Sequence, residues 1–593
     1  MLPEDEQERG HSTRSRLWAA LRWLVLAQAV GTILTNAYFL RFLEPAVSRK
    51  VLGIVSVLLA AAALLLDRNP SAFRPGTIWL VVRRHAVVAA LGLILLLAFG
   101  LRYWGAHFGL PQSYVADEFD YVHSYLKMLK RGDLNPHWWI HPSLQAYVNV
   151  VTYLVVFFIE VPTGRWQSVQ ELMEEDFLFW GRFGAGVIPG TLVVLVTFFL
   201  GKRVFGTRVG LIAAALMAVF PAAVEVSQYN KPDPLLAFMA PLSLLVTLVY
   251  LERGGTRLAL LAGLSVGLTA AAKYNGGFVL VSFLLAVAIR ERGRFLARPD
   301  FYLGLLGTIG GFVIGCPYFI VELPKFIDAV ANAMYNYGYR GWPDAEGTDN
   351  WAYHAKYAVT YGAGWAAVIA GLGGLGVALN RLDSRLVVLL SFPVLYYGYY
   401  SSQRMNFPGN LVCVYPFLAV LAAFGLEQAV DVLRRAGPFP RRLPVQPVAT
   451  AVLLAVALGV PLDTSIALNV ERSRDDTGSL ARVWIDGHFA PQTHLAVERQ
   501  CPALDRRRHR VTIQSRIIDR SVADYRDEGV EYLVVSSAQY DRFGPEHRQT
   551  RNYYKLFEIC REVARFEPVE GRVIGPTIRI LRVPTRPEEA EGS

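Results

Sequence analysis

Residues 86–104, with the sequence AVVAALGLILLLAFGLRYW, form a block that is long and apolar enough to cross a lipid bilayer, because a spanning helix needs about 20 apolar residues. Of the 593 residues of the chain, 53% are hydrophobic and only 18% are charged, whereas about 25% charged residues is usual for a soluble protein. Because the apolar residues come in long blocks, the sequence predicts a membrane protein built from helices.

The same length criterion predicts about thirteen transmembrane helices in all. The twelve further segments are 17–40, 50–66, 183–201, 209–226, 234–251, 257–273, 277–290, 302–320, 355–379, 385–401, 410–431 and 446–463. The first of these follows charged residues and lacks a small-residue cleavage site, so we do not interpret it as a removable signal peptide.

Basic residues cluster between the predicted spans, and each cluster falls at an end that is cytoplasmic if the N-terminus lies inside. Arg83-Arg84 and Arg434-Arg435 are examples. This is the positive-inside pattern, which explains the net charge of +10 without a nucleic-acid partner. We therefore predict a multi-pass protein of the plasma (inner) membrane with a cytoplasmic N-terminus and a C-terminus outside.

Three parts follow from this topology. Residues 1–84 hold a cytoplasmic tail and an extra helical hairpin, 85–463 a transmembrane core with long outer loops at 105–182 and 321–352, and 464–593 a soluble extracytoplasmic domain. Likely β-strand patterns in the last part alternate with a helical one, which indicates an α/β domain. The strands are expected at 493–498, 511–515, 532–537 and 572–581, and the helix at 551–564.

Four cysteines are present, two of them, Cys501 and Cys560, in the predicted outer domain. Oxidation is permitted outside the cytoplasm, so a disulfide between these two is allowed, although spacing alone does not establish it.

The first long outer loop has structure of its own. Residues 117–130 place apolar side chains at helical spacing, and Gly132 is suited to ending a helix. A second apolar stretch, 143–160, is long enough to approach a membrane span. We interpret it as an interfacial helix, because a crossing here would move every later basic loop to the other side of the membrane.

The acidic sequence Asp117-Glu118-Phe119-Asp120 opens that first helix. One interpretation is structural: Asp117 caps the helix, with Asp120 three residues on, as in a capping box. The other is catalytic, since a carboxylate held at the mouth of a membrane bundle is suited to act as general base for an acceptor hydroxyl. The two interpretations are compatible.

Other charged and polar residues are predicted on the same outer face. Lys231 and Asp233 either pair with each other or form part of a functional site, and Lys273 either extends its amine to the interface or binds a phosphate. Arginine grips phosphate through two parallel hydrogen bonds, which makes Arg404 and Arg182 candidates as well. Together, carboxylates and cations on one face suit a reaction on a phosphate-bearing donor. Walker, Rossmann and zinc-binding motifs are missing from the sequence.

At these residues the chain resembles glycosyltransferases of the GT-C fold class, in the branch of protein O-mannosyltransferases and the lipid A aminoarabinose transferase. The resemblance covers about residues 85–540. Ser143 stands where the family has a second proline, and the hairpin at 17–66 is extra. The similar segments are Asp117-Glu118, His141-Pro142-Ser143-Leu144, Gly181-Arg182-Phe183, SQYNKPDPLLAF with Asp233, AAKYNGG with Lys273, Arg404 through Pro416, and ARVWIDGHFAPQTHLAVE after the last span.

The resemblance implies transfer of a sugar from a polyprenyl-phosphate donor to an extracytoplasmic acceptor, which is a glycan, a lipid or a protein hydroxyl. It implies that Asp117 is the base and Glu118 a neighbouring catalytic residue. It also implies no cofactor; a divalent metal on the acidic residues is the less favoured alternative. We assign donor phosphate binding to Lys273, Arg404 and Arg182, and substrate binding to Asp120, His141, Tyr229, Lys231, Asp233 and Tyr274.

Two other functions fit the same charges. A transporter or flippase for a lipid-linked sugar would use them as a translocation path, but transporters usually place such groups near the middle of the membrane. A non-catalytic protein would only bind the polyprenyl-linked sugar, and loss of Asp117 would have favoured that alternative.

Overall fold

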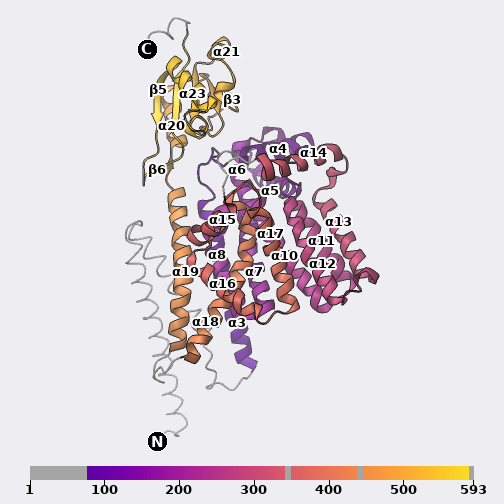
Figure 1. Cartoon of the computed structure of the whole chain (residues 1–593). Helices are drawn as coiled ribbons and strands as arrows, with labels where there is room; N and C mark the ends of the chain where they lie inside the picture. Colours follow the sequence, from indigo (N-terminus) through magenta and orange to yellow (C-terminus); the bar gives the residue numbers. More distant parts are fainter. Residues whose placement is uncertain (1–76, 116, 341–348, 437–444, 586–593) are drawn as a thin grey trace.

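A computed structural model describes residues 77–115, 117–340, 349–436 and 445–585. It consists of a helical bundle with a smaller α/β domain above one end (Figure 1). The expected all-helical bundle with a C-terminal sheet-containing domain is thus present. The predicted spans at 17–40 and 50–66 lie outside the described residues.

Each of the other predicted spans coincides with helix. The bundle helices are α3 (Thr77–Gly105), α7 (Ile188–Phe205), α8 (Thr207–Val219), α10 (Pro232–Arg253), α11 (Thr256–Ala272), α12 (Val279–Arg290), α13 (Pro299–Gly315), α16 (Trp365–Leu379), α17 (Ser384–Ser401), α18 (Tyr415–Ala436) and α19 (Val445–Arg472). Within the described ranges, six helical segments are long and apolar enough to cross a membrane, or seven if one bent pair is a single span. The number of about thirteen therefore stays a prediction.

Two predicted spans are broken. Residues 355–379 belong to two segments, Asn350–Gly362 and Trp365–Leu379, which meet at an angle of 120°; Gly364 between them has φ 83°. The segment 209–226 breaks at Phe220, because the residue before a proline disfavours helical geometry. The buried Arg102 guanidinium donates to the Met217 and Ala218 carbonyl oxygens next to this break, which satisfies acceptors that the helix leaves open.

Helices α11 and α13 pack with their backbones almost in contact. A Cβ atom added at Gly263 would lie 1.9 Å from the Gly304 carbonyl oxygen, and one at Gly267 would lie 2.0 Å from the Thr308 carbonyl oxygen. Small residues permit this approach between membrane helices. The contact fixes the position of α11, whose C-terminal end carries Lys273.

A layer of shorter helices covers the end of the bundle nearest the α/β domain (Figure 1). It contains α4 (Glu118–Arg131), α5 (Leu144–Glu160), α6 (Glu174–Arg182), which continues as the π-helix η4 (Phe183–Val187), and α14 (Leu323–Tyr335). Helix α4 is the amphipathic helix that the sequence predicts, and Gly132 ends it in a left-handed conformation. Helix α5 meets the length criterion for a span, so its interfacial position stays a prediction.

The capping prediction for Asp117 is wrong. Its side chain accepts no hydrogen bond from the first turn of α4, and its backbone is left-handed, with φ 68°. Aspartate tolerates this conformation better than most residues.

The α/β domain contains a five-stranded sheet in the order β3-β2-β4-β7-β5. Strands β2 (His494–Glu498), β3 (Arg510–Gln514) and β4 (Tyr532–Ser536) are parallel, whereas β7 (Ile578–Arg582) and β5 (Arg561–Phe566) are antiparallel to their neighbours. Helices α20 (Thr477–His488) and α23 (Arg548–Ile559) contribute to the hydrophobic cores on opposite faces. A strand that is covered on both faces has a nearly continuous run of apolar residues in its sequence, as β2 and β4 do.

Two boundaries predicted in this domain are wrong. The helix expected at 551–564 ends at Ile559, and residues 561–566 form the edge strand β5. This edge strand carries charged side chains, which hinder pairing with other chains. The same charged residues interrupt the apolar pattern by which a strand is recognised in the sequence. The strand expected at 572–581 is divided into β6 (Val573–Ile574), which pairs with β1 (Asp475–Asp476), and β7.

The two cysteines of this domain are free and buried. Cys501 belongs to the hydrophobic core on the α20 face and Cys560 to the core on the α23 face. Because the sheet lies between the two cores, the disulfide allowed by the sequence does not form.

Glu498, at the end of β2, is a buried carboxyl group. It accepts hydrogen bonds from the backbone N–H groups of Ile517 and Ser536 and from the Tyr553 hydroxyl. Burial disfavours its charged form and raises its pKa to about 7.

We predict that the α/β domain loses stability as the pH rises from about 4.5 to about 7. The folded domain holds the Glu498 proton more tightly than the unfolded chain does. The resulting stabilisation is therefore complete below the pKa of Glu498 in the unfolded chain and is lost above its pKa in the folded domain. This stabilisation amounts to about 3 kcal/mol. Thermal unfolding of the full-length protein at a series of pH values measures this slope. We expect Glu498→Gln to remove this dependence on pH, and the control Glu567→Gln, at an exposed residue, to retain it. An unchanged slope in Glu498→Gln would contradict the raised pKa of Glu498.

Candidate active site

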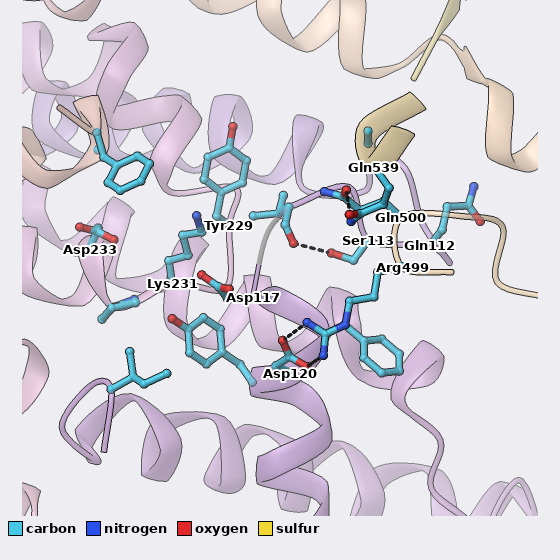
Figure 2. Close-up of a pocket in the computed structure, with 18 of the residues that line it drawn as sticks. Gln112, Ser113, Asp117, Asp120, Tyr229, Lys231, Asp233, Arg499, Gln500 and Gln539 are labelled. Carbon is cyan, nitrogen blue, oxygen red and sulfur yellow. Dashed lines mark hydrogen bonds and ion pairs between the residues drawn. The ribbon is translucent and has the colours of Figure 1, made fainter. Parts of the chain in front are cut away.

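A cavity of about 1020 Å³ lies between the α/β domain and the end of the bundle nearest to it. The bundle wall brings together most of the site residues that the sequence predicts, and Figure 2 shows several of them facing one another. The second wall consists of residues 497–504 after β2 and residues from other parts of the α/β domain. The predicted residues that line the cavity are Asp117, Asp120, His141, Tyr229, Lys231, Asp233 and Lys273.

Asp117 is the exposed carboxylate of this cavity. No hydrogen bond or ion pair engages its side chain within the part of the chain that the structure describes. Figure 2 shows the carboxylate directed toward the space that Lys231 and Asp233 also face. A left-handed backbone at a non-glycine residue is uncommon and persists where its surroundings impose it. For Asp117, those surroundings include the buried ion pair that the next residue, Glu118, forms with Arg182.

Glu118 is fully buried and forms a bidentate ion pair with the equally buried Arg182 of α6. The Arg182 Nε and Nη2 atoms lie 2.8 Å and 2.7 Å from the two Glu118 oxygen atoms. The same carboxylate accepts hydrogen bonds from the Ser113 hydroxyl (2.6 Å) and the Asn230 backbone N–H (3.0 Å). Burial opposes the charge of Glu118, but Arg182 and these donors bring the pKa below its ordinary value.

This geometry differs from the roles predicted for both residues. The Arg182 Nη1 atom donates to the carbonyl oxygens of Ala106 and Phe108, so the guanidinium is buried behind the cavity wall and does not line the cavity. Glu118 likewise faces Arg182 and not the cavity. The pair ties α4, α6 and the loops at Ser113 and Asn230 together, which makes both residues positioning residues for Asp117.

The cavity contains two ammonium groups. Lys273 Nζ lies 2.7 Å from the Asp233 carboxylate and 2.8 Å from the Asn410 amide oxygen. The alternative that Lys231 pairs with Asp233 is therefore wrong. Lys231 Nζ lies 6.0 Å from the centroid of the Tyr229 ring and forms no ion pair with a carboxylate of the described residues, so its charge is available to a bound anion.

Neutral groups complete the bundle wall. The Tyr121 ring packs against His141 at a centroid distance of 6.0 Å. Burial, followed by the nearby Lys273 ammonium, lowers the pKa of His141 to about 3, so this imidazole is uncharged at neutral pH. The Tyr229 hydroxyl donates to Glu225 and accepts from Arg472 at the end of α19.

Besides Glu118 and Arg182, two more predicted site residues lie beside the cavity and do not line it. The Tyr274 hydroxyl donates to the Trp139 carbonyl oxygen at 2.9 Å. Arg404 donates from Nη1 to the Tyr339 carbonyl oxygen at 2.7 Å and from its backbone N–H to the Tyr337 carbonyl oxygen. Its neighbours Met405 and Phe407 do line the cavity, so Arg404 supports the wall.

Several residues of the site were not predicted from the sequence. The Arg499 guanidinium binds the Asp120 carboxylate through two contacts of 3.0 Å (Figure 2), and the Arg472 guanidinium lies between the rings of Phe108 and Tyr229, at 4.3 Å and 5.0 Å from their centroids. Arg499 directly follows a parallel strand, at the sheet edge where ligands usually bind. This position at the end of a strand could have indicated Arg499 as a site residue, but only if the strands had been known to be parallel. Other unpredicted residues of the cavity lining include Asn410, Gln500 and Gln539.

The acidic residues do not converge as ligands for one metal ion. Glu118 is bound to Arg182 and Asp120 to Arg499, and the described ranges contain no group of three or more His, Cys, Asp or Glu placed to hold a metal. Independence from a metal stays a prediction.

Comparisons with known proteins agree with the resemblance read from the sequence. Residues 175–315 match the family model described as dolichyl-phosphate-mannose-protein mannosyltransferase. None of the curated proteins compared with this chain matches it. The structure is similar to ArnT from Cupriavidus metallidurans bound to undecaprenyl phosphate, with a TM-score of 0.53 and 16% identity over 88% of this chain and 100% of that chain. The apo state of the same ArnT gives a TM-score of 0.52 and 16% identity over 84% and 99%.

The chain has the GT-C glycosyltransferase fold. The family match begins in α6, which carries Arg182, continues through η4 and α7, and includes Asp233 and Lys273 before it reaches the end of α13. Asp117 and Glu118 lie before the matched range, and the α/β domain lies after it.

We predict that Glu118→Gln lowers the free energy of unfolding by about 3–5 kcal/mol, because it leaves the Arg182 charge buried without its counter-ion. Thermal unfolding in detergent measures the loss. The matched control is Glu252→Gln, which breaks the partly exposed Arg203–Glu252 pair and costs less than about 1 kcal/mol. Equal effects of the two substitutions would show that the buried pair does not hold the site.

Proposed function

We propose that the protein is a membrane glycosyltransferase that moves a sugar from a polyprenyl-phosphate donor to an extracytoplasmic acceptor, with Asp117 as general base. The observation that carries this proposal is the exposed Asp117 carboxylate. It faces the cavity and has no hydrogen-bond partner among the described residues, whereas every neighbouring carboxylate of the site is bound to a cation or a hydroxyl. A base must be free to accept a proton from its substrate.

The proposed step is a single displacement at the anomeric carbon of the donor sugar. The acceptor hydroxyl oxygen forms the new glycosidic bond while its proton passes to the Asp117 carboxylate. The bond between the anomeric carbon and the phosphate oxygen breaks, and its electron pair leaves with the polyprenyl phosphate.

Lys231 and Lys273 are the cations proposed to stabilise the departing phosphate. Both line the cavity that Asp117 faces. Lys273 is held in place by Asp233 and Asn410, which leaves one ammonium proton for a phosphate oxygen. Fixed cations stabilise developing negative charge without the reorganisation that water requires.

The comparisons support a lipid-linked donor. The matched family model is named for dolichyl-phosphate-mannose-dependent transfer to protein, and one similar ArnT structure holds undecaprenyl phosphate. Polyprenyl phosphates place their charged group at the membrane surface, which is where the bundle wall of the cavity lies if the apolar helices cross the bilayer.

A transporter or flippase is the second candidate, and the position of the charges disfavours it. The charged residues line the cavity at the end of the bundle nearest the α/β domain, whereas transporters bind substrate near the middle of the membrane between repeated halves. Figure 1 shows that end of the bundle and the α/β domain next to it. A non-catalytic binder of a polyprenyl-linked sugar would not need the free carboxylate of Asp117.

We predict that Asp117→Asn retains donor binding and lowers the rate of sugar transfer by about 10²–10⁴-fold, the usual contribution of a general base. The measurement is transfer of label from radiolabelled polyprenyl-phosphate mannose, glucose and arabinose in membranes. Asp133→Asn makes the same change in the same outer loop but outside the cavity lining, and it retains activity. Full activity of Asp117→Asn would refute the base assignment, and bound donor that is moved across the bilayer but never transferred would favour the flippase.

A further inference from the structure

The wall of the cavity opposite Asp117 is the carboxyl edge of a parallel sheet. Residues 497–504 include the end of β2 and the segment that follows it, and Ala538 and Gln539 follow β4. Both strands are parallel and adjacent, so their carboxyl ends meet at the same edge. That edge faces the bundle, because its residues line one cavity with bundle residues such as Asp117 and Lys273.

The strand order makes this edge a topological switch point. From β2 the chain goes first to β3 on one side and then to β4 on the other side of β2. The chain leaves β2 toward β3 and leaves β4 toward β5, which lies at the opposite end of the sheet. Connections that leave neighbouring strands in opposite directions open a crevice at their carboxyl ends, where open α/β sheets bind their ligands. Here the crevice opens into the cavity that also contains Asp117.

The side chains at this edge carry planar groups that form paired hydrogen bonds. Arg499 presents a guanidinium, half-exposed and opposite Asp120. Gln500 and Gln539 present carboxamides, each with a donor and an acceptor. The contact between these amides is 3.3 Å and that from Gln500 to the Tyr114 carbonyl oxygen is 3.5 Å, longer than the usual 2.9–3.0 Å. Such loose contacts are readily exchanged for contacts to a ligand.

Aromatic faces accompany these planar polar groups. Phe119, Tyr121 and Phe407 line the same cavity as Arg499 and Gln500. A sugar ring has neighbouring hydroxyls that each donate and accept, and an apolar face of C–H groups. Paired amide or guanidinium hydrogen bonds match the hydroxyls, and an aromatic ring matches the apolar face.

We infer that the carboxyl edge of the α/β domain binds a carbohydrate acceptor, with Gln500 and Gln539 as its hydrogen-bonding residues. This inference rests on the proposed glycosyl transfer and specifies its acceptor. The Asp120–Arg499 pair lies one helical turn after Asp117 and fixes the sheet edge over the base. The cavity of about 1020 Å³ reaches the upper end of single-ligand pockets, roughly 300–1000 Å³, and accommodates a donor sugar and an acceptor sugar together.

The test uses the full-length protein, a radiolabelled polyprenyl-phosphate sugar, and two kinds of soluble acceptor probe. One is a panel of p-nitrophenyl hexosides and pentosides, and the other is a peptide rich in serine and threonine. We expect transfer to a glycoside. Gln500→Ala and Gln539→Ala each raise the KM for that glycoside about tenfold, equivalent to ~1.4 kcal/mol, while kcat and the donor KM stay unchanged.

Gln492→Ala is the matched control. Gln492 is also a glutamine with a left-handed backbone, with φ 70° against 64° for Gln500, but it precedes β2 at the opposite edge of the sheet. It leaves the KM unchanged. If Gln500→Ala unfolds, Gln500→Asn retains an amide and tolerates the left-handed backbone, and it shows the same rise in KM.

Equal KM values for Gln500→Ala and Gln492→Ala, or transfer to the peptide alone, overturn the inference while the glycosyltransferase function stands. If wild type transfers to no probe, saturation-transfer NMR of the glycosides on the full-length protein decides. A signal that Gln500→Ala loses and Gln492→Ala keeps supports the carbohydrate site independently of transfer, and no signal in wild type refutes it.

Discussion

The buried ion pair between Glu118 and Arg182 is the constraint on which the site depends. Two opposite charges without solvent contact are stable only when their hydrogen-bonding capacity is filled. Glu118 accepts from Arg182, Ser113 and Asn230, and Arg182 also donates to two carbonyl oxygens of the preceding loop. Four separate segments must therefore be in position for the pair to form, and their position leaves Asp117 as the exposed neighbour.

The second constraint is the connection between bundle and α/β domain. Helix α19 runs as one element to Arg472, whose guanidinium lies between Phe108 and Tyr229. Phe108 in turn contacts the Arg182 guanidinium at 4.4 Å from its ring centroid. The end of α19 is thus packed against residues that adjoin Asp117 and Glu118, and the ion pair between Asp120 and Arg499 joins the domain to α4.

Much of the architecture could be predicted from composition and periodicity. Apolar block length predicted the bundle helices from α3 onward, and strand patterns at 493–498, 511–515 and 532–537 predicted β2, β3 and β4. The pattern of apolar residues does not indicate where a helix bends, so the breaks at Phe220 and Gly364 were missed, although Pro221 and the glycine are the physical causes. Edge strand β5 was taken for helix because its charged residues resemble an exposed helical face.

The site was predicted more accurately in location than in the role of each residue. The types and order of Asp117, Lys231, Asp233 and Lys273 indicated one face, and the structure brings them to one cavity. The pairing of Glu118 with Arg182, and of Asp233 with Lys273, depends on which helices are neighbours, and spacing along the chain does not encode it. The contribution of Arg499 and Gln500 required the relative position of two domains, which no local pattern specifies.

The continuous helix α19 has a further consequence for which substrates can react. A helix of 28 residues is about 42 Å long. Because Arg472 at its end packs between Phe108 and Tyr229, the helix holds the sheet edge at a constant height above the bundle. For the proposed lipid-anchored donor, this fixed height sets how far from the membrane surface its phosphate and the sheet edge can meet.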